Sequence, residues 1–238
     1  MGFRLDNIQK SFFLSWLKVF FTNKTKQEEM ERITWLLDPG HGGMIPDGEG
    51  GLKYATAPAK MHTFDDGFVL YEGVFNRQVI QFVKDIMKAK GMKYIDVVDS
   101  EYDIPLGDRV QKANQFYVED KRCAYFSMHG NAANTKAHGI EIYTSKGETT
   151  SDKYATVILE EIMKEFPDEK YRLDTWSDGD IDKEANYFVL KKTAMPAVLL
   201  EMWFFDNRED AEKMNNPEMR RRVAEAIVRA FESIEKQF

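Results

Sequence analysis

The segment ITWLLDPGHGG, residues 33–43, decides the fold because it joins an apolar run directly to a glycine-rich turn. Residues 33–37 are apolar apart from one threonine, which predicts a buried strand ending at residues 38–40. His41 follows among glycines, which permit a sharp bend and a close approach of the backbone to a ligand. The segment therefore predicts a strand whose carboxyl end carries a histidine available for chemistry.

Strand and helix patterns alternate outward from this segment. Apolar side chains recur at helical spacing over residues 71–90, and Gly91 provides a stop for that helix. We expect further strands over residues 94–98, 124–128, 140–144 and 198–202, and helices over residues 105–117, 151–166 and 208–238. This alternation predicts an α/β domain with a layered mixed or mainly parallel sheet flanked by helices. Residues 42–60, rich in glycine, proline and small side chains, are expected to form a long surface loop.

Composition narrows the classes of function. The 238 residues are 43% hydrophobic and 31% charged, which is ordinary for a globular enzyme and allows a sizeable core. The formal net charge of -7 argues against a general attraction to nucleic acid or anionic lipid. Cys123 is the single cysteine, so no intramolecular disulfide can form, and we expect it in the core.

The amino-terminal segment differs from the rest of the chain. Residues 11–21 are apolar but too few to span a bilayer, so we expect no integral membrane span. No small-residue cleavage site follows, so we also expect no cleavable signal peptide. Apolar side chains at helical spacing predict an amphipathic helix: Leu5, Ile8, Phe12, Trp16 and Val19. That helix either docks on the main domain or contacts a partner or a membrane surface.

Three chemistry-bearing residues stand where predicted strands end. His41 and His129 each follow an apolar run, and Glu201 closes the run of residues 198–200. Ligands of open α/β sheets bind outside the carboxyl ends of the strands, so these residues can converge. A single histidine at a strand end is more often a hydrogen-bonded structural residue. A lone glutamate among apolar residues is less expected, because an unpaired buried carboxylate is costly.

The combination indicates zinc. A catalytic zinc site commonly takes two imidazoles and one carboxylate and leaves a fourth position for water. His41 and His129 would supply the imidazoles, and Glu72 is a reasonable third ligand. An acid at the start of a helix is also stabilised by the helix dipole, so local sequence leaves both roles of Glu72 open.

Five motifs then occur in a recognisable order: LDPGHGG (residues 37–43), Glu72 with Asn76, SMHGN (residues 127–131), HGIEIY (residues 138–143) and MPAVLLE (residues 195–201). Together they resemble the zinc-dependent N-acetylmuramoyl-L-alanine amidases, the AmiC-like cell-wall hydrolases that also serve as phage endolysins. Residues 104–109 with Asn114 are similar to a further helix motif of that family. The resemblance covers roughly residue 33 to the carboxyl terminus.

The resemblance carries expectations for the site. It implies that His41, Glu72 and His129 bind Zn²⁺ and that Glu201 is the catalytic acid/base. The substrate would be peptidoglycan, cut between N-acetylmuramic acid and L-alanine by a zinc-activated water. Ser127 and Asn131 would support the second histidine.

The resemblance also implies structural roles and a domain division. Arg109 and Asn114 would fix a helix beside the sheet. The fold would be the phosphorylase/hydrolase-like amidase fold. Residues 1–32 would be a helical appendage and connector, and residues 33–238 the catalytic domain. If the chain is phage-encoded, we expect it in the host cytoplasm before its release to the cell wall.

The sequence departs from the family pattern in three places, so the resemblance does not specify which stem peptide the enzyme would prefer. Residues 43–72 form a long stretch that contains His62, which we expect to be solvent-exposed and not a ligand. Residues 98–101 and 178–181 replace family residues that face the substrate. Two alternatives remain: another zinc amide hydrolase on the same scaffold, such as a peptidase or deacetylase, or a catalytically silent cell-wall-binding module. Intact Glu201 argues against the silent module, because binding alone needs no buried acid.

Overall fold

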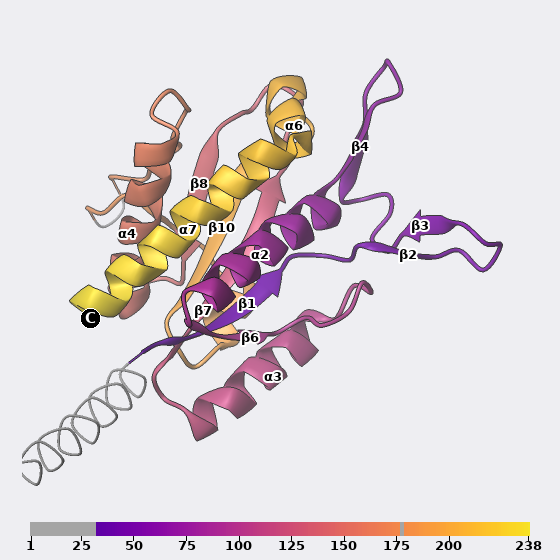
Figure 1. Ribbon diagram of the computed structural model, residues 1–238. Helices are drawn as coiled ribbons and strands as arrows, with labels where there is room; N and C mark the ends of the chain where they lie inside the picture. Colours follow the sequence, from indigo (N-terminus) through magenta and orange to yellow (C-terminus); the bar gives the residue numbers. More distant parts are fainter. Residues whose placement is uncertain (1–31, 177–178) are drawn as a thin grey trace, which may run out of the picture. The chain divides into compact units, whose positions relative to one another are not determined.

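The computed structural model describes residues 32–176 and 179–238, which build a mixed sheet covered by helices (Figure 1). The sheet has six strands in the order β6-β1-β7-β10-β8-β9. Their bounds are β1 Thr34–Pro39, β6 Lys93–Asp96, β7 Cys123–Asn131, β8 Ile140–Thr144, β9 Lys183–Glu184 and β10 Ala197–Phe204. The predicted mixed α/β sheet is confirmed. The predicted amino-terminal helix lies outside the described residues, and the proposed division at residue 32 stays a prediction.

The directions of the strands determine which strand ends lie next to one another. β1 runs parallel to β6 and β7, and β10 runs parallel to β7, whereas β8 is antiparallel to β10. The register puts Leu37 beside Phe126 and Glu201 beside His129. The carboxyl ends of β1, β7 and β10 therefore meet at a single edge.

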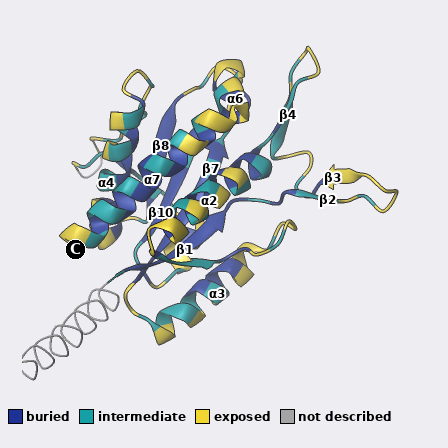
Figure 2. Cartoon of the chain, in the orientation of Figure 1, coloured by how far each residue is buried: buried dark blue, intermediate teal, exposed yellow. Residues whose placement is uncertain are grey.

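Helices cover both faces of the sheet, which explains the apolar strands. Trp35 of β1 stacks on Phe231 with ring centroids 3.6 Å apart, whereas the next residue, Leu36, packs in a core cluster with Val110 and Leu190 on the other side. All of β1 is buried, as expected for a parallel strand covered twice (Figure 2). On one face lie α2 (Glu72–Ala89), α4 (Thr150–Glu165) and α7 (Pro217–Gln237), and on the other lie α3 (Leu106–Glu119) and α5 (Phe188–Lys192).

The predicted helical segment 208–238 is two helices. α6 covers Arg208–Asn215, and α7 begins at Pro217. A proline has no backbone N–H to donate into a preceding turn, so it fits the first turn of a new helix. Asn216 caps α7 by accepting a hydrogen bond from the Glu218 N–H at 2.9 Å. The break separates α6, which contacts β10, from α7, which packs against α2 and α4.

The expectation of one long loop over residues 42–60 is wrong. Two antiparallel hairpins fill the region before α2: β2 (Met44–Pro46) with β3 (Leu52–Tyr54), and β4 (Met61–Thr63) with β5 (Val69–Tyr71). His62 is half-buried in β4 against the Phe64 ring, with centroids 4.6 Å apart, so its predicted exposure is also wrong. The Lys60 carbonyl accepts a hydrogen bond from the Glu72 N–H at 3.0 Å, so the turn before β4 lies against the start of α2.

One further expectation concerns burial. Cys123 is a buried free thiol at the start of β7, as predicted. No helix within the described ranges has the length and apolarity required to cross a bilayer.

Candidate metal centre and active site

His41 projects from a sharply bent turn at the end of β1. Its backbone adopts a φ of 65°, a left-handed conformation that is uncommon for a residue with a side chain. Asn76 donates a hydrogen bond to the Gly40 carbonyl at 3.0 Å, and Arg77 donates to the His41 carbonyl. A Cβ on Gly40 would lie 2.1 Å from the His129 ring, so only glycine fits there. Such strain, held by neighbouring side chains, is typical of functional turns.

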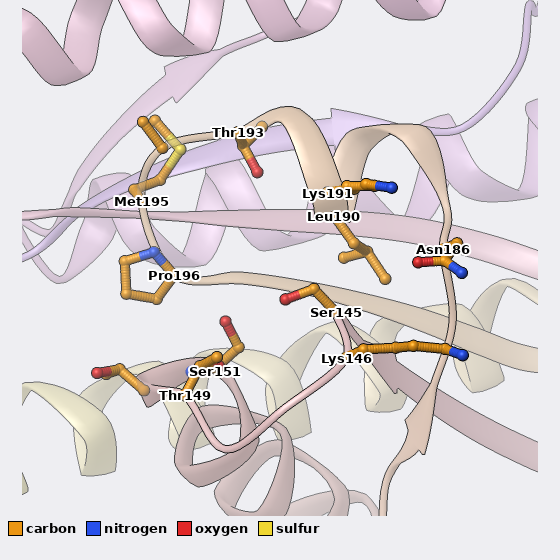
Figure 3. A pocket seen from close by; sticks show the side chains of 12 residues that line it. Ser145, Lys146, Thr149, Ser151, Asn186, Leu190, Lys191, Thr193, Met195 and Pro196 are labelled. Atoms are coloured by element: carbon orange, nitrogen blue, oxygen red, sulfur yellow. The ribbon is translucent and has the colours of Figure 1, made fainter.

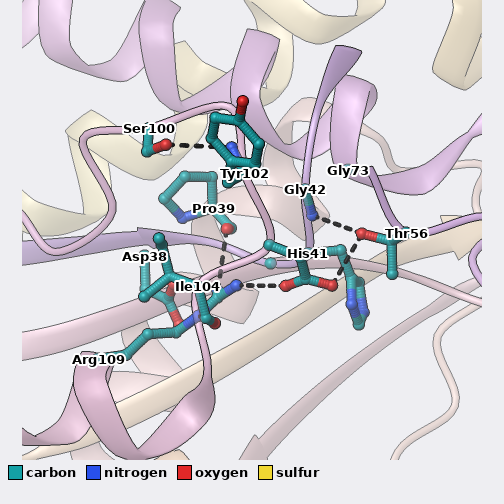
Figure 4. A network of polar contacts seen from close by, with 12 residues as sticks. Asp38, Pro39, His41, Gly42, Thr56, Gly73, Ser100, Tyr102, Ile104 and Arg109 are labelled. Atoms are coloured by element: carbon teal, nitrogen blue, oxygen red, sulfur yellow. Dashed lines mark hydrogen bonds and ion pairs between the residues drawn. The ribbon is translucent and has the colours of Figure 1, made fainter. Parts of the chain in front are cut away.

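A buried ionic network fixes the strand end behind His41. The Arg109 guanidinium donates to Asp38 at 2.7 Å, to the Ile104 carbonyl at 2.7 Å and to Asp103 at 3.0 Å (Figure 4). Asp103 also accepts from Thr56 at 2.8 Å, which ties the first hairpin to the same network. Arg109 thus has the structural contacts that the sequence indicated.

The other oxygen of Asp38 faces β7. It accepts hydrogen bonds from Tyr125 at 2.6 Å and from Ser127 at 2.9 Å. These residues are almost fully buried, and each polar atom in the set has a partner. The network therefore locks β1 and β7 in register just before the residues that carry the two histidines.

Glu72, the first residue of α2, lies between the two imidazoles. Its Oε1 is 3.3 Å from His41 Nε2 and 3.1 Å from His129 Nδ1. The two rings meet edge to face, with centroids 5.0 Å apart. One ligand atom from each of the three residues lies within 4.8 Å of the others. The structure thus gathers three residues from β1, α2 and β7 into one cluster.

The cluster fits a zinc ion. His41 Nε2 and Glu72 Oε2 are buried and have no hydrogen-bond partner among residues 32–176 and 179–238. Glu72 is fully buried, while the side chains of His41 and His129 are 20% and 15% exposed. Two nitrogen donors and one carboxylate are the ligand set that catalytic zinc prefers, and magnesium or calcium would require oxygen donors.

The charges in the cluster favour a bound cation. Burial alone would raise the pKa of Glu72, but its close contacts with the His129 and His41 imidazoles hold it well below its usual range. Burial opposes the charged form of His129, yet the contact with Glu72 and the charge of Glu201 leave its pKa raised. The carboxylate therefore stays ionised, and positive charge is stabilised around it.

Glu201 stands beside this cluster on β10. It is half-buried, and its Oε2 is shielded from solvent and has no hydrogen-bond partner in the part of the chain that the structure describes. Burial raises the pKa of Glu201 to about 8; the His129 charge opposes this shift and the Glu72 charge adds to it. A pocket of about 320 Å³ contains Glu201, His41 and His129 among its lining residues. Glu201 is thus a proton-binding group facing the space beside the two histidines.

Glu141 stabilises the neighbourhood of Glu201 from β8, directly across the antiparallel pair. It accepts hydrogen bonds from Asn131 at 2.8 Å, Tyr143 at 2.6 Å and Lys183 at 2.8 Å, and from Arg172. Burial pushes the pKa of Glu141 up, but these partners lower it below its usual value. Asn131 therefore supports the site through Glu141. The sequence did not single out this network, because its members come from four separate segments.

Other pocket residues were also missed. Lys60 Nζ lies 3.6 Å from Glu72 Oε2, at the end of the turn before β4. Tyr187 and Phe188 line the same pocket and remain 41% and 43% exposed. The adjacent aromatic pair was the available sequence signal for the pocket wall. For Lys60 there was none, because its place depends on the hairpins.

The remaining sequence candidates lie elsewhere. Asn114 donates to the Lys192 carbonyl and accepts from the Ala194 N–H, both at 2.8 Å, and so joins α3 to the end of α5. His138 is exposed and does not line the pocket with Glu201. Among the described residues, His62 also lies outside the metal-ligand cluster.

A second pocket, of about 490 Å³, opens between α5 and the start of α4 (Figure 3). Its lining includes Ser145, Lys146, Thr149 and Asn186. None of the four predicted site residues lines it. Although it is the larger cavity, it lacks the imidazole and carboxylate groups that the chemistry needs.

The sequence profile of the N-acetylmuramoyl-L-alanine amidase family matches residues 36–233, from the strand before His41 to near the end of α7. The chain belongs to this family. All four site residues fall inside the matched range. The match agrees with the resemblance carried by the five motifs.

The names of individual proteins similar to this chain agree with the family match. The chain is 31% identical over 211 residues to an uncharacterised cell wall amidase of Bacillus anthracis, covering 86% of this chain but 36% of that protein. It is 29% identical over 201 residues to the endolysin of Bacillus phage SPP1, covering 82% of this chain and 63% of the endolysin. The fold matches an N-acetylmuramoyl-L-alanine amidase from Clostridium difficile 630 with a TM-score of 0.70 at 23% identity, covering 87% and 98% of the two chains. The chain thus spans about a third of the length of the Bacillus anthracis amidase.

Proposed function

We propose that this chain hydrolyses the amide bond between N-acetylmuramic acid and L-alanine in peptidoglycan. The observation that carries the proposal is the convergence of His41, Glu72 and His129 beside the shielded carboxylate of Glu201. The amidase family match supports the choice of reaction among amide hydrolyses.

His41, Glu72 and His129 would hold the zinc ion through nitrogens and a carboxylate that face one another. Zinc bound there supplies a Lewis acid that polarises the scissile carbonyl and acidifies water. The protein's contribution is to keep the ligands deprotonated and oriented. Asn76 does this for Glu72, because its amide lies 3.4 Å from Glu72 Oε1 and bonds the Gly40 carbonyl as well.

Glu201 would act as the general base and then as the general acid. It accepts a proton from the attacking water, whose oxygen bonds to the carbonyl carbon, and it returns that proton to the nitrogen of L-alanine as the carbon–nitrogen bond breaks. The raised pKa of Glu201, about 8, partly reflects the negative charge of Glu72. Positive charge at the three ligands opposes that effect, so the ionised base becomes accessible near neutral pH.

The pocket walls would orient the substrate. Tyr187 and Phe188 expose aromatic surface on one side, and Leu106 is 50% exposed on α3. These side chains can bury apolar parts of the sugar and the stem peptide, while Lys60 and Asn131 offer polar contacts. Positioning by such walls contributes to the rate by holding the amide bond near Glu201.

Digestion of purified peptidoglycan, with mass analysis of the released fragments, tests the proposal. We expect new L-alanine amino termini from the wild type and about 1,000-fold slower release of them from Glu201→Gln. Zinc content measured on the same two samples should be equal, which separates loss of chemistry from loss of metal. Release of acetate, or cleavage inside the stem peptide, would contradict the proposed bond. Binding to peptidoglycan without any product would contradict enzymatic activity.

A further inference from the structure

A second group of acids lies at the amino-terminal end of α4. Asp152 belongs to the first turn of that helix, and Asp180 and Asp182 come just before β9. Each offers one carboxylate oxygen, and the three oxygens lie within 4.8 Å of one another. None of these residues lines the pocket that contains Glu201. Two segments far apart in the chain therefore bring three like charges together away from the amidase site.

Burial makes this arrangement costly. Asp182 is 1% exposed and Asp152 is 8% exposed. Among the described residues, the buried Oδ1 atom of each has no hydrogen-bond partner. In the part of the chain that the structure describes, neither residue forms an ion pair with a lysine or arginine. Buried carboxylates without opposite charge are strongly destabilising, so a compensating ligand or proton is required.

Local structure explains only part of the cluster. Asp152 Oδ2 accepts from the Thr149 backbone N–H in a capping box at the start of α4. Asp182 Oδ2 accepts from Thr144 Oγ1 at 2.7 Å. These bonds orient both carboxylates through one oxygen each. Capping therefore accounts for the position of Asp152 and not for the convergence of the other two acids on it.

Protonation is one means of relieving the repulsion. Burial raises the pKa of Asp182 to about 7; Thr144 opposes this shift, and the neighbouring carboxylates of Asp180 and Asp152 add to it. Near neutral pH the cluster thus holds a weakly bound proton. A divalent cation that supplies more positive charge can displace that proton.

We propose that Asp152, Asp180 and Asp182 form a calcium site. All three donors are oxygens, which hard cations prefer, and no imidazole or thiol belongs to the cluster to favour zinc. Calcium accepts irregular coordination by six to eight oxygens, whereas magnesium requires a near-ideal octahedron. Three carboxylates from a helix end and a connecting segment, completed by water and nearby oxygens, suit calcium better.

The position of the site gives it a structural consequence. Lys183, next to Asp182, donates to Glu141, and the segment continues to Tyr187 and Phe188 in the amidase pocket wall. An ion held by Asp152 and Asp182 would therefore anchor this segment to α4. The inference does not depend on the amidase reaction, because it concerns residues outside that pocket.

Calorimetric titration and thermal melting in calcium chloride test the site on the full, zinc-loaded chain at pH 7.5. We expect saturating calcium to raise the wild-type melting temperature by about 5 °C. Asp182→Asn and Asp152→Asn should lose the titration heat and the shift. Glu148→Gln, which removes an exposed charge from the loop before α4, should keep both.

The calcium-free melts distinguish a lost site from a damaged fold. Asp182→Asn removes a buried charge, so without calcium it should melt at or above the wild-type temperature. The absence of any wild-type shift up to about 10 mM calcium, beyond the weakest range of ordinary protein sites, would overturn the proposal. An equal shift in wild type and Asp182→Asn would overturn it too, because calcium would then bind elsewhere.

Discussion

Glu72 and Asp182 are both buried carboxylates, but their surroundings differ in kind. Glu72 lies between two imidazoles, and its pKa falls well below the usual range. Asp182 lies beside two further carboxylates, and its pKa rises to about 7. Burial disfavours the charged form in both places, so the neighbours decide the outcome. The first cluster is a mixed nitrogen and oxygen site suited to zinc, and the second is an oxygen site suited to calcium.

The largest effect is expected where the nitrogen donors are removed. His129→Ala should lose stoichiometric zinc and reduce hydrolysis at least about 1,000-fold, because the ion then has one imidazole and one carboxylate left. Zinc content by elemental analysis and product release from peptidoglycan measure the two effects. Asp152→Asn is the matched control from the oxygen cluster and should retain its zinc. Full zinc occupancy in His129→Ala would remove the distinction between the clusters.

Glu201→Gln should separate chemistry from metal binding. The amide has nearly the same shape but cannot accept the water's proton, so kcat should fall about 1,000-fold. Zinc content should stay at the wild-type level, because Glu201 is not among the residues gathered around Glu72. Circular dichroism provides the folding control. Wild-type turnover in this variant would show that another group acts as the base.

The oxygen cluster should make stability depend on pH. The folded-state pKa of Asp182, about 7, lies above its ordinary value of 3.8, so the folded protein binds the proton more tightly than the unfolded chain. Without divalent cations, stability should therefore fall as the pH rises from about 4 to about 8, by on the order of 3 kcal/mol.

Urea unfolding of wild type and Asp182→Asn across this pH range measures that contribution. The variant should lack the decrease assigned to Asp182, so the difference between the two curves should grow with pH. Parallel curves would show that Asp182 is not the titrating group. Added calcium should flatten the wild-type curve by replacing the proton.

The smallest effect is expected at Lys60. Its ammonium lies 3.6 Å from Glu72 Oε2 and is 39% exposed, so it competes weakly with a cation for the same carboxylate. Lys60→Met should therefore lower the zinc dissociation constant about fivefold. Competition with a chromophoric chelator measures it. Lys53→Met, in the neighbouring hairpin, is the control and should leave the constant unchanged; weaker zinc binding in Lys60→Met would contradict the competition.

Much of the sheet could be predicted because its strands are apolar and bounded by turn residues. The predicted strand over residues 140–144 coincides with β8, and Gly91 follows the end of α2 as expected. The hairpins before α2 were missed because their strands have three residues each and little apolar alternation. Their pairing depends on turns and on packing over α2, which local patterns do not reveal.

The two clusters also differ in how far the sequence could predict them. His41, His129 and Glu201 could be named from the sequence because each follows an apolar run, and the carboxyl ends of parallel strands meet at one edge of the sheet. Asp180 and Asp182 lie in a polar segment where acids are unremarkable, and their approach to Asp152 is a tertiary contact. The position of Lys60 could not be predicted from the sequence for the same reason. Strand ends therefore predict a site, whereas loop-to-helix contacts require the structure.

X-ray diffraction from crystals of the purified chain, collected above and below the zinc absorption edge, tests the central claim most directly. The account predicts one anomalous peak within about 2.0–2.2 Å of His41 Nε2, His129 Nδ1 and a Glu72 oxygen. It predicts no zinc peak at Asp152 and Asp182. A zinc-loaded crystal with no peak among the three ligands, or with its peak at another position, would contradict the proposed centre.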